Sequence, residues 1–173
     1  MSILDLKGVV FDLDNTIYDE YEYFLNVFKK FSDNRNKELK VERLKKFYQQ
    51  YRSTSKNILL DLLRYLNLTG DNIETSLDDI FLIYKSISET LTPYEDFIYF
   101  LAQIKKKNIK TCILTNGIKI VQENKFNNLN ISKKIDYFIS ARELGNGIEK
   151  PSLEVFQKTI ELMGISEKNL LFI

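Results

Sequence analysis

The sequence predicts an α/β protein, in which a mainly parallel sheet carries helices on both faces and a further group of helices is inserted. Two observations support this fold class. Short apolar runs alternate with segments of helical periodicity along most of the 173 residues, and residues 18–91 show helical periodicity alone. Because parallel strands need crossover connections, we expect a core of residues 1–17 and 92–173, with the insertion 18–91 inside the first right-handed crossover.

The first strand is expected at Leu6–Phe11, because this run is mostly apolar, rich in valine and too short for a helix. Four amphipathic helices should follow, since apolar residues recur there at intervals of three and four. Ser76 and Asp79 have the spacing of a capping box at the fourth helix. The four apolar stripes contain Tyr21, Phe24, Leu25 and Phe28; Leu44, Phe47, Tyr48 and Tyr51; Ile58, Leu59, Leu62, Leu63 and Leu66; and Leu77, Ile80, Phe81, Tyr84 and Ile87.

The return to the core is marked by Thr92, Pro93 and Glu95, which predict an N-cap, a first helical residue and a capping-box acid. The helix that they start should run to about Lys107. A second helix should begin at Ile118. A third should be capped by Ser152 and closed by Gly164. The remaining strands are expected at Ile109–Leu114, Asp136–Ser140 and Leu170–Ile173.

Composition excludes several classes of function. The formal net charge is +1, so bulk charge indicates neither nucleic acid nor an anionic membrane as a partner. No apolar run approaches the length of a membrane helix. Cys112 is the only cysteine, which excludes an internal disulfide and favours a reducing, cytoplasmic location. The chain has no histidine, so acid–base chemistry must use carboxylates, lysine or tyrosine.

Chemically useful side chains fall at the ends of the expected strands. Asp12 and Asp14 follow the first strand at alternate positions, and Thr115 and Asn116 follow the second. Lys150 precedes the last helix. Ligands of parallel sheets bind at the carboxyl ends of the strands, so these groups can converge on one phosphoryl group. Taken singly, each group also has the ordinary explanation of a turn, a helix cap or a surface lysine.

These residues closely resemble the motifs of the haloacid dehalogenase superfamily of phosphohydrolases. The first motif, an apolar strand followed by Asp-x-Asp-x-Thr, matches Val9 through Thr16. The second matches Ile113 through Gly117, and the lysine of the third, often followed by proline, matches Lys150 and Pro151. The resemblance implies a Rossmann-like core. It also implies that the inserted helices form the cap of the subfamily that includes phosphoglycolate phosphatases and nucleotidases.

The resemblance assigns roles to five residues. Asp12 would be the nucleophile that forms an aspartyl-phosphate, and Asp14 would protonate the leaving oxygen and later activate water. Thr115, the Asn116 amide and Lys150 would hold the phosphoryl oxygens. Mg²⁺ would bind the Asp12 carboxylate and the Asp14 carbonyl oxygen. The expected substrate is a small phosphorylated metabolite of unspecified identity, and the sequence does not indicate an oligomeric state.

Other readings stay open. A phosphomutase of the same superfamily would keep both acids, whereas dehalogenation has no need of the second acid, Asp14. A signalling receiver domain fits poorly, because it has no room for the insertion. The fourth motif of the superfamily would follow Ile173, so we interpret the chain as truncated and expect weak magnesium binding and weak activity from the segment alone. A catalytically incomplete binding protein is therefore a further alternative.

Overall fold

The computed structural model describes residues 5–69, 72–145 and 147–173; residues 1–4, part of the predicted core segment, lie outside this range. The chain divides into two compact units. The core unit consists of Met1–Asp19 and Thr90–Ile173, and the insertion unit is Glu20–Glu89. From the sequence we expected the two junctions after residue 17 and before residue 92, each two residues away from this division.

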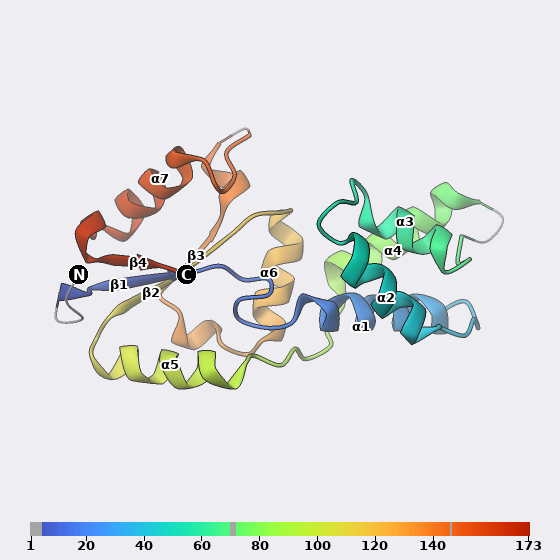
Figure 1. Ribbon diagram of the computed structural model, residues 1–173, viewed down its shortest axis with the longest axis horizontal. Helices are drawn as coiled ribbons and strands as arrows, with labels where there is room; N and C mark the ends of the chain where they lie inside the picture. The colour runs from blue at the N-terminus through green and yellow to red at the C-terminus, as the bar shows by residue number, and fades with distance from the viewer. Residues whose placement is uncertain (1–4, 70–71, 146) are drawn as a thin grey trace. The chain divides into compact units, whose positions relative to one another are not determined.

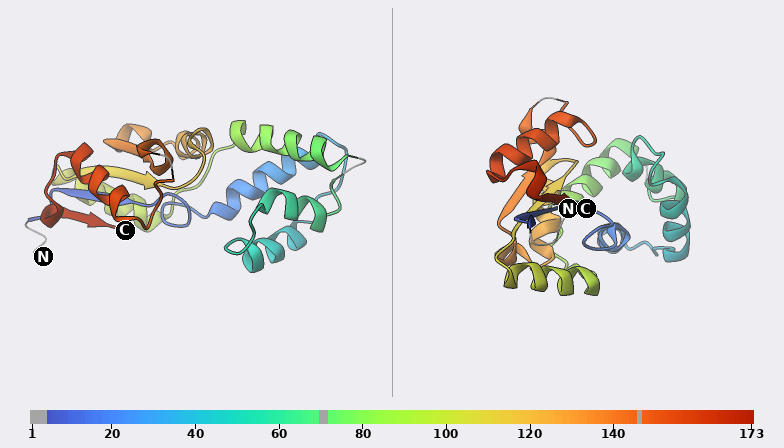
Figure 2. Two further views of the ribbon diagram at one scale, coloured as in Figure 1. Left: turned by 90° about the horizontal axis from the view of Figure 1, so that it is seen from above. Right: turned by 60° about the vertical axis from the view of Figure 1, so that its left-hand side comes forward.

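The described residues of the core unit form one four-stranded parallel sheet, as predicted (Figure 1). Its strands lie in the order β3-β2-β1-β4, and Figure 2 shows their arrows pointing the same way. In the register, Val10 of β1 lies opposite Cys112 of β2 and Phe172 of β4. The strands are β1 (Gly8–Phe11), β2 (Lys110–Thr115), β3 (Tyr137–Ser140) and β4 (Leu170–Phe172).

Helices cover both faces of this sheet. Phe11 of β1 packs edge-on against Phe97 of α5 (Glu95–Lys106), with ring centroids 5.2 Å apart. On the same face, Phe138 stacks on Phe126 of α6 (Lys119–Asn128). The opposite face is covered by α7 (Leu153–Met163), which lies across the sheet from α5 in Figure 1. The chain therefore changes faces between β3 and β4, and the carboxyl end of β1 lies at this switch point, where α/β sheets bind ligands.

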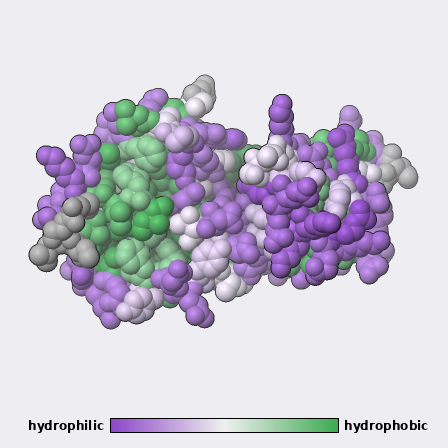
Figure 3. All heavy atoms as spheres, in the orientation of Figure 1, coloured by the Kyte–Doolittle hydropathy of each residue, from purple (hydrophilic) through white to green (hydrophobic). Residues whose placement is uncertain are grey.

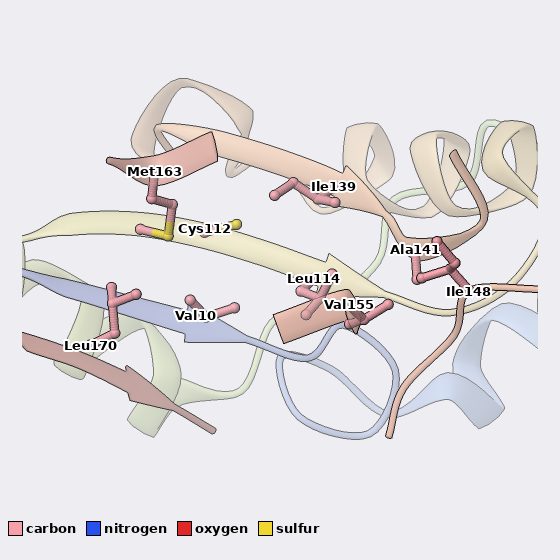
Figure 4. Close-up of a cluster of buried hydrophobic side chains, with 9 residues drawn as sticks. All are labelled: Val10, Cys112, Leu114, Ile139, Ala141, Ile148, Val155, Met163 and Leu170. Atoms are coloured by element: carbon pink, nitrogen blue, oxygen red, sulfur yellow. The ribbon is translucent and has the colours of Figure 1, made fainter. Parts of the chain in front are cut away.

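The face under α7 forms a compact apolar cluster (Figure 4). Alternate residues of a strand point to the same face, which explains why Val10, Cys112 and Leu114 all enter it. Burial raises the pKa of the Cys112 thiol to about 12, so the only cysteine is a core residue, as its place within a strand predicts. The cluster consists of Val10, Cys112, Leu114, Ile139, Ala141, Ile148, Val155, Met163 and Leu170.

Apolar side chains also reach the surface of the core unit. Figure 3 shows them gathered between α7 and α5, where β4 forms an edge of the sheet. Leu171 and Ile173 are 38% and 51% exposed. This edge of the sheet therefore offers apolar contact area close to the end of β1.

In the insertion unit, the residues that the structure describes form four helices, as predicted. They pack around aromatic residues, and Tyr23, Phe24 and Phe28 are fully buried. The buried Glu20 carboxylate accepts hydrogen bonds from Arg52 Nε and Nη2, both at 2.8 Å, and this contact raises the pKa of Arg52. Among the residues described, no helix combines the length and apolar character needed to span a bilayer. The helices are α1 (Glu20–Asp33), α2 (Val41–Tyr51), α3 (Ile58–Tyr65) and α4 (Ile73–Ser86).

Two predicted helix starts were wrong. Asn72 caps α4 by accepting hydrogen bonds from Glu74 N and Thr75 N, whereas Ser76 lies inside the helix, where its hydroxyl donates to backbone carbonyls. The helix predicted to start at Thr92 and Pro93 begins at Glu95 instead, because Pro93 forms a β-bridge with Tyr18.

The predicted boundaries of α7 are confirmed. The Ser152 hydroxyl accepts a hydrogen bond from Val155 N, and Gly164 closes the helix in the left-handed conformation, with φ 63°.

Asp136 stabilises the end of the sheet opposite the ligand-binding edge. Its Oδ2 accepts hydrogen bonds from Lys105 Nζ at 2.8 Å, Thr111 N at 2.8 Å and Thr111 Oγ1 at 2.9 Å. Although desolvation raises the pKa of Asp136, these hydrogen bonds outweigh it and lower the pKa from 3.8 to about 2. The stabilisation is therefore present above the ordinary pKa and is lost as the pH falls from about 4 towards 2.

We expect Asp136→Asn to lower the free energy of unfolding at pH 7 by about 1 kcal/mol, allowing for solvent screening. The difference from the parent protein should shrink as the pH falls below 4. Urea unfolding at pH 7 and pH 3 measures both values. The exposed Asp5 provides a matched control, and Asp5→Asn should leave the free energy of unfolding unchanged at both pH values. An equal loss at both pH values would show that the charge of Asp136 contributes nothing.

Candidate active site

Asp12 directly follows β1 and is fixed by its backbone. Its N–H donates to Ile173 O at 2.9 Å, which extends the pairing of β1 with β4 by one residue. Its side chain is 41% exposed, and Oδ1 lies 2.6 Å from Lys150 Nζ and accepts a hydrogen bond from Leu13 N at 2.7 Å. Within the described part of the chain, Oδ2 has no such contact. An exposed carboxylate oxygen beside a cation is thus available at the end of β1.

Lys150 reaches this carboxylate from the loop before α7. Its Nζ also donates to Leu114 O at 2.8 Å, and its side chain is only 19% exposed. The side chain of Asn116 holds the Lys150 backbone through two hydrogen bonds, from Asn116 Nδ2 to Lys150 O at 3.0 Å and from Lys150 N to Asn116 Oδ1 at 2.9 Å. The loops after β2 and before α7 are therefore joined, and the ammonium group is directed at Asp12.

Thr115 is the last residue of β2, and its hydroxyl lies inside the site. Its Oγ1 accepts a hydrogen bond from Gln122 Nε2 at 2.7 Å and donates to Asn116 O at 3.2 Å. The residue is 1% exposed. After it the chain turns at Gly117, whose φ of 111° favours glycine, and then enters α6.

Asp14 lies two residues after Asp12, and its side chain contacts α6. Its Oδ1 accepts a hydrogen bond from Tyr18 Oη at 2.7 Å, and Oδ2 accepts one from Gln122 Nε2 at 2.9 Å. The Nζ of Lys125 lies 2.9 Å from Oδ1 and 3.0 Å from Oδ2. Three donors, one of them a cation, therefore hold both oxygens of this carboxylate.

The structure brings the five predicted residues to one edge of the sheet in two linked groups. Asp12 pairs with Lys150, and Asp14 is joined to Thr115 through the amide of Gln122. Asn116 connects the groups, because its side chain holds Lys150 while its carbonyl oxygen accepts from Gln122 at 2.6 Å. For Asn116 we predicted a backbone-amide contact with phosphate, and the structure adds this side-chain clamp.

The two residues that sequence reasoning missed are Gln122 and Lys125, both on α6. They are 3% and 1% exposed, although such polar side chains are rarely fully buried. Their spacing of three places them on one face of the helix, next to the buried Val121 and Phe126. The sequence did contain a signal for these two residues: a glutamine and a lysine interrupt the apolar stripe of the helix that follows the second motif.

A cavity of about 310 Å³ opens beside the Asp12–Lys150 pair. Its polar lining comes from Asp12, Thr16 and Lys150, and the rest of its wall is apolar. The apolar lining residues are Val10, Phe11, Leu114, Phe156, Phe172 and Ile173. The cavity therefore has a charged end, at Lys150, that suits an anionic group, and apolar walls elsewhere.

The described residues contain no cluster of three or more His, Cys, Asp or Glu side chains that could hold a metal ion. The donors that the site does offer are oxygens: the Asp12 carboxylate and the backbone carbonyl of Asp14. Hard oxygen donors of this kind fit Mg²⁺, which binds through one or two carboxylates and keeps several waters.

A family model described as haloacid dehalogenase-like hydrolase matches residues 6–173. A glyceraldehyde 3-phosphate phosphatase from Methanocaldococcus jannaschii is 26% identical over 186 residues, covering 97% of this chain and 75% of that protein. An (S)-2-haloacid dehalogenase from Pseudomonas fluorescens is 27% identical over 180 residues, covering 98% of this chain and 76% of that protein.

The fold also has solved counterparts. A hydrolase of subfamily IA of the same superfamily, from Geobacter sulfurreducens, superposes with a TM-score of 0.72. It is 17% identical, and the match covers 97% of this chain and 77% of that one. At this identity the likeness concerns the fold. The α/β fold is thus shared.

Proposed function

Because the chain belongs to the family of haloacid dehalogenase-like hydrolases, we propose that it hydrolyses a small-molecule phosphate monoester with Mg²⁺, through an aspartyl-phosphate on Asp12. Relatives named as a phosphatase and as haloacid dehalogenases both align along nearly the whole chain. These two kinds of relative differ in the leaving group, which is an alkoxide for a phosphatase and a halide for a dehalogenase.

The observation that carries the proposal is the second carboxylate, Asp14. A halide is a weak base and departs without a proton, whereas an alkoxide is a strong base and departs easily only when an acid protonates it. Here Asp14 is held at the same sheet edge as Asp12, by hydrogen bonds to both of its oxygens. A second positioned acid is useful for breaking a phosphate ester and has no task in displacing a halide.

The first half-reaction transfers the phosphoryl group to Asp12. The Oδ2 atom attacks phosphorus, the bond from phosphorus to the ester oxygen breaks, and the carboxyl proton of Asp14 moves to that oxygen to form the alcohol. Lys150 Nζ, 2.6 Å from Asp12 Oδ1, offsets the repulsion between a carboxylate and an anionic phosphate. The Thr115 hydroxyl and the Asn116 amide are the donors proposed for the phosphoryl oxygens.

The second half-reaction restores the protein. The Asp14 carboxylate accepts a proton from water, the water oxygen attacks phosphorus, and the bond between phosphorus and Asp12 breaks to release inorganic phosphate. Splitting hydrolysis into two displacements lowers the barrier of each. The Asp12 carboxylate and the Asp14 carbonyl would hold Mg²⁺, which neutralises charge on the phosphoryl oxygens when bound.

The proposal is tested by comparing two products. We expect inorganic phosphate to be released from at least one of glyceraldehyde 3-phosphate, phosphoglycolate and a nucleoside monophosphate, and the release should stop when EDTA removes Mg²⁺. Halide release from (S)-2-chloropropionate should remain at the background level. Halide release without phosphate release would refute the proposal and establish the dehalogenase reaction.

A further inference from the structure

We propose that Lys125, together with Gln122, is a positioning residue that holds the Asp14 carboxylate in its working orientation before substrate binds. The proposal rests on the phosphatase function above. It adds a task for α6, which carries none of the residues that we assigned from the sequence motifs. Neither Lys125 nor Gln122 need touch the substrate, because each acts through Asp14 or Thr115.

The first support is the burial of Lys125. Its side chain is 2% exposed, and its Nζ lies within 3.0 Å of both Asp14 oxygens. Burying an ammonium group is costly unless a partner compensates it, and an apolar residue of similar size packs as well or better. A lysine at this position therefore contributes little to folding that an apolar residue would not, but it fixes both oxygens of Asp14 at once.

The second support is the amide of Gln122. Its Nε2 lies 2.9 Å from Asp14 Oδ2, 2.7 Å from Thr115 Oγ1 and 2.6 Å from Asn116 O. Its Oε1 is buried without a hydrogen-bond partner among the described residues. Leaving a buried oxygen unsatisfied destabilises the fold, so packing alone does not explain a glutamine at this position.

The loop after β2 is shaped around this amide. A Cβ placed on Gly117 would lie 3.3 Å from Gln122 Nε2, and the φ of 111° at Gly117 is unfavourable for other residues. Glycine thus lets the chain turn closely past the glutamine side chain. The amide can then connect the acid of the first motif with the hydroxyl of the second.

The consequence for catalysis is preorganisation. Because Gln122 donates to Thr115 Oγ1, the hydroxyl keeps its own hydrogen for an acceptor, which in this structure is Asn116 O. Asp14 has both oxygens fixed and cannot rotate without breaking several contacts. A general acid and a phosphate donor that are already aligned need no rearrangement in the transition state.

The test is Lys125→Met, which removes the ammonium group and keeps an unbranched apolar side chain. Lys119→Met is the matched control, since it makes the same change on the same helix at a half-exposed lysine that pairs with Glu143. Both are assayed with Mg²⁺ in the full chain, with glyceraldehyde 3-phosphate and with p-nitrophenyl phosphate, whose leaving group needs no proton. Thermal unfolding is measured for each variant.

We expect Lys125→Met to slow steady-state turnover of the alkyl phosphate about 10²-fold, the usual effect of a misplaced catalytic group. With p-nitrophenyl phosphate it should still release nitrophenolate in a burst of one equivalent per site, followed by slow turnover, because Asp14 then activates water poorly. Lys119→Met should behave as the parent protein. A merely structural role would lower the burst and the steady state together.

The outcomes separate the two proposals. If the parent protein releases no phosphate, the phosphatase function fails. If the parent is active and Lys125→Met matches it, or loses burst and turnover equally, the positioning role is overturned and the function stands. Should Lys125→Met fail to fold, Gln122→Met tests the positioning role instead, since it keeps the Lys125–Asp14 ion pair and the length of the side chain. Unchanged turnover of the alkyl phosphate in that variant also overturns the inference.

Discussion

Asp12→Asn should abolish phosphate release, with a loss of at least about 10⁴-fold in turnover. The amide that replaces the carboxylate is a poor nucleophile, and it also removes the negative charge that pairs with Lys150 at 2.6 Å. The fold should tolerate the change, because Asp12 lies just after a strand and its side chain is 41% exposed rather than part of the core. Initial rates of phosphate release measure the effect, and thermal unfolding checks the fold.

Asp12→Glu distinguishes position from charge. It keeps the carboxylate beside Lys150 but moves it by one methylene, so it should be nearly as inactive as Asp12→Asn. In the parent protein, acid quenching during turnover should trap one phosphoryl group per chain, bound through an acyl phosphate that hydroxylamine releases. Substantial turnover by Asp12→Asn, or no trapped phosphoryl group in an active parent, would place the nucleophile elsewhere.

The architecture of the core could be predicted from the sequence because local and global preferences agree there. The run that ends at Phe11 is apolar and short. A parallel strand that is buried on both faces favours apolar residues, because buried polar side chains would each need a hydrogen-bond partner. The caps of α7 were predicted for a similar reason. Ser152 and Gly164 satisfy backbone groups locally, so tertiary contacts leave them unchanged.

The helix starts that were wrong show where local patterns compete. The spacing of Ser76 and Asp79 fits a capping box, but Asn72 lies four residues earlier and caps the helix first. At α5, the pairing of Pro93 with Tyr18 keeps that stretch extended and delays the helix. In the second case a contact between residues far apart in sequence overrides a local signal, and the sequence alone contains no measure of it.

The candidate site divides in the same way. Asp12, Thr115 and Lys150 could be predicted because each lies at the end of a recognisable element and belongs to a motif. Lys125 and Gln122 belong to no motif, and their importance depends on the side of α6 that meets Asp14. Helical periodicity predicts that they share a face, but the partner of that face follows from tertiary packing.

Asp14→Asn should separate the two halves of the reaction, and we expect turnover of an alkyl phosphate to fall by about 10²- to 10⁴-fold. An amide can neither protonate the leaving oxygen nor take a proton from water. Release of nitrophenolate from p-nitrophenyl phosphate should continue for about one equivalent, since that leaving group departs unprotonated. Rapid-mixing measurements of nitrophenolate and of phosphate give the two steps separately. Undiminished hydrolysis of the alkyl phosphate would show that Asp14 is not the acid.

This variant also removes the Asp14 carboxylate that lies against the buried Lys125, and removing one partner of a buried ion pair is destabilising. We therefore expect Asp14→Asn to unfold at a lower temperature than the parent. The double variant Asp14→Asn with Lys125→Met removes both members of the pair, so it should recover much of the stability while turnover stays low. Recovery of stability without recovery of activity would separate the structural contribution of the ion pair from the chemical contribution of Asp14. If the double variant regained turnover, the slow rate of Asp14→Asn would have come from the broken contact with Lys125 rather than from the missing acid.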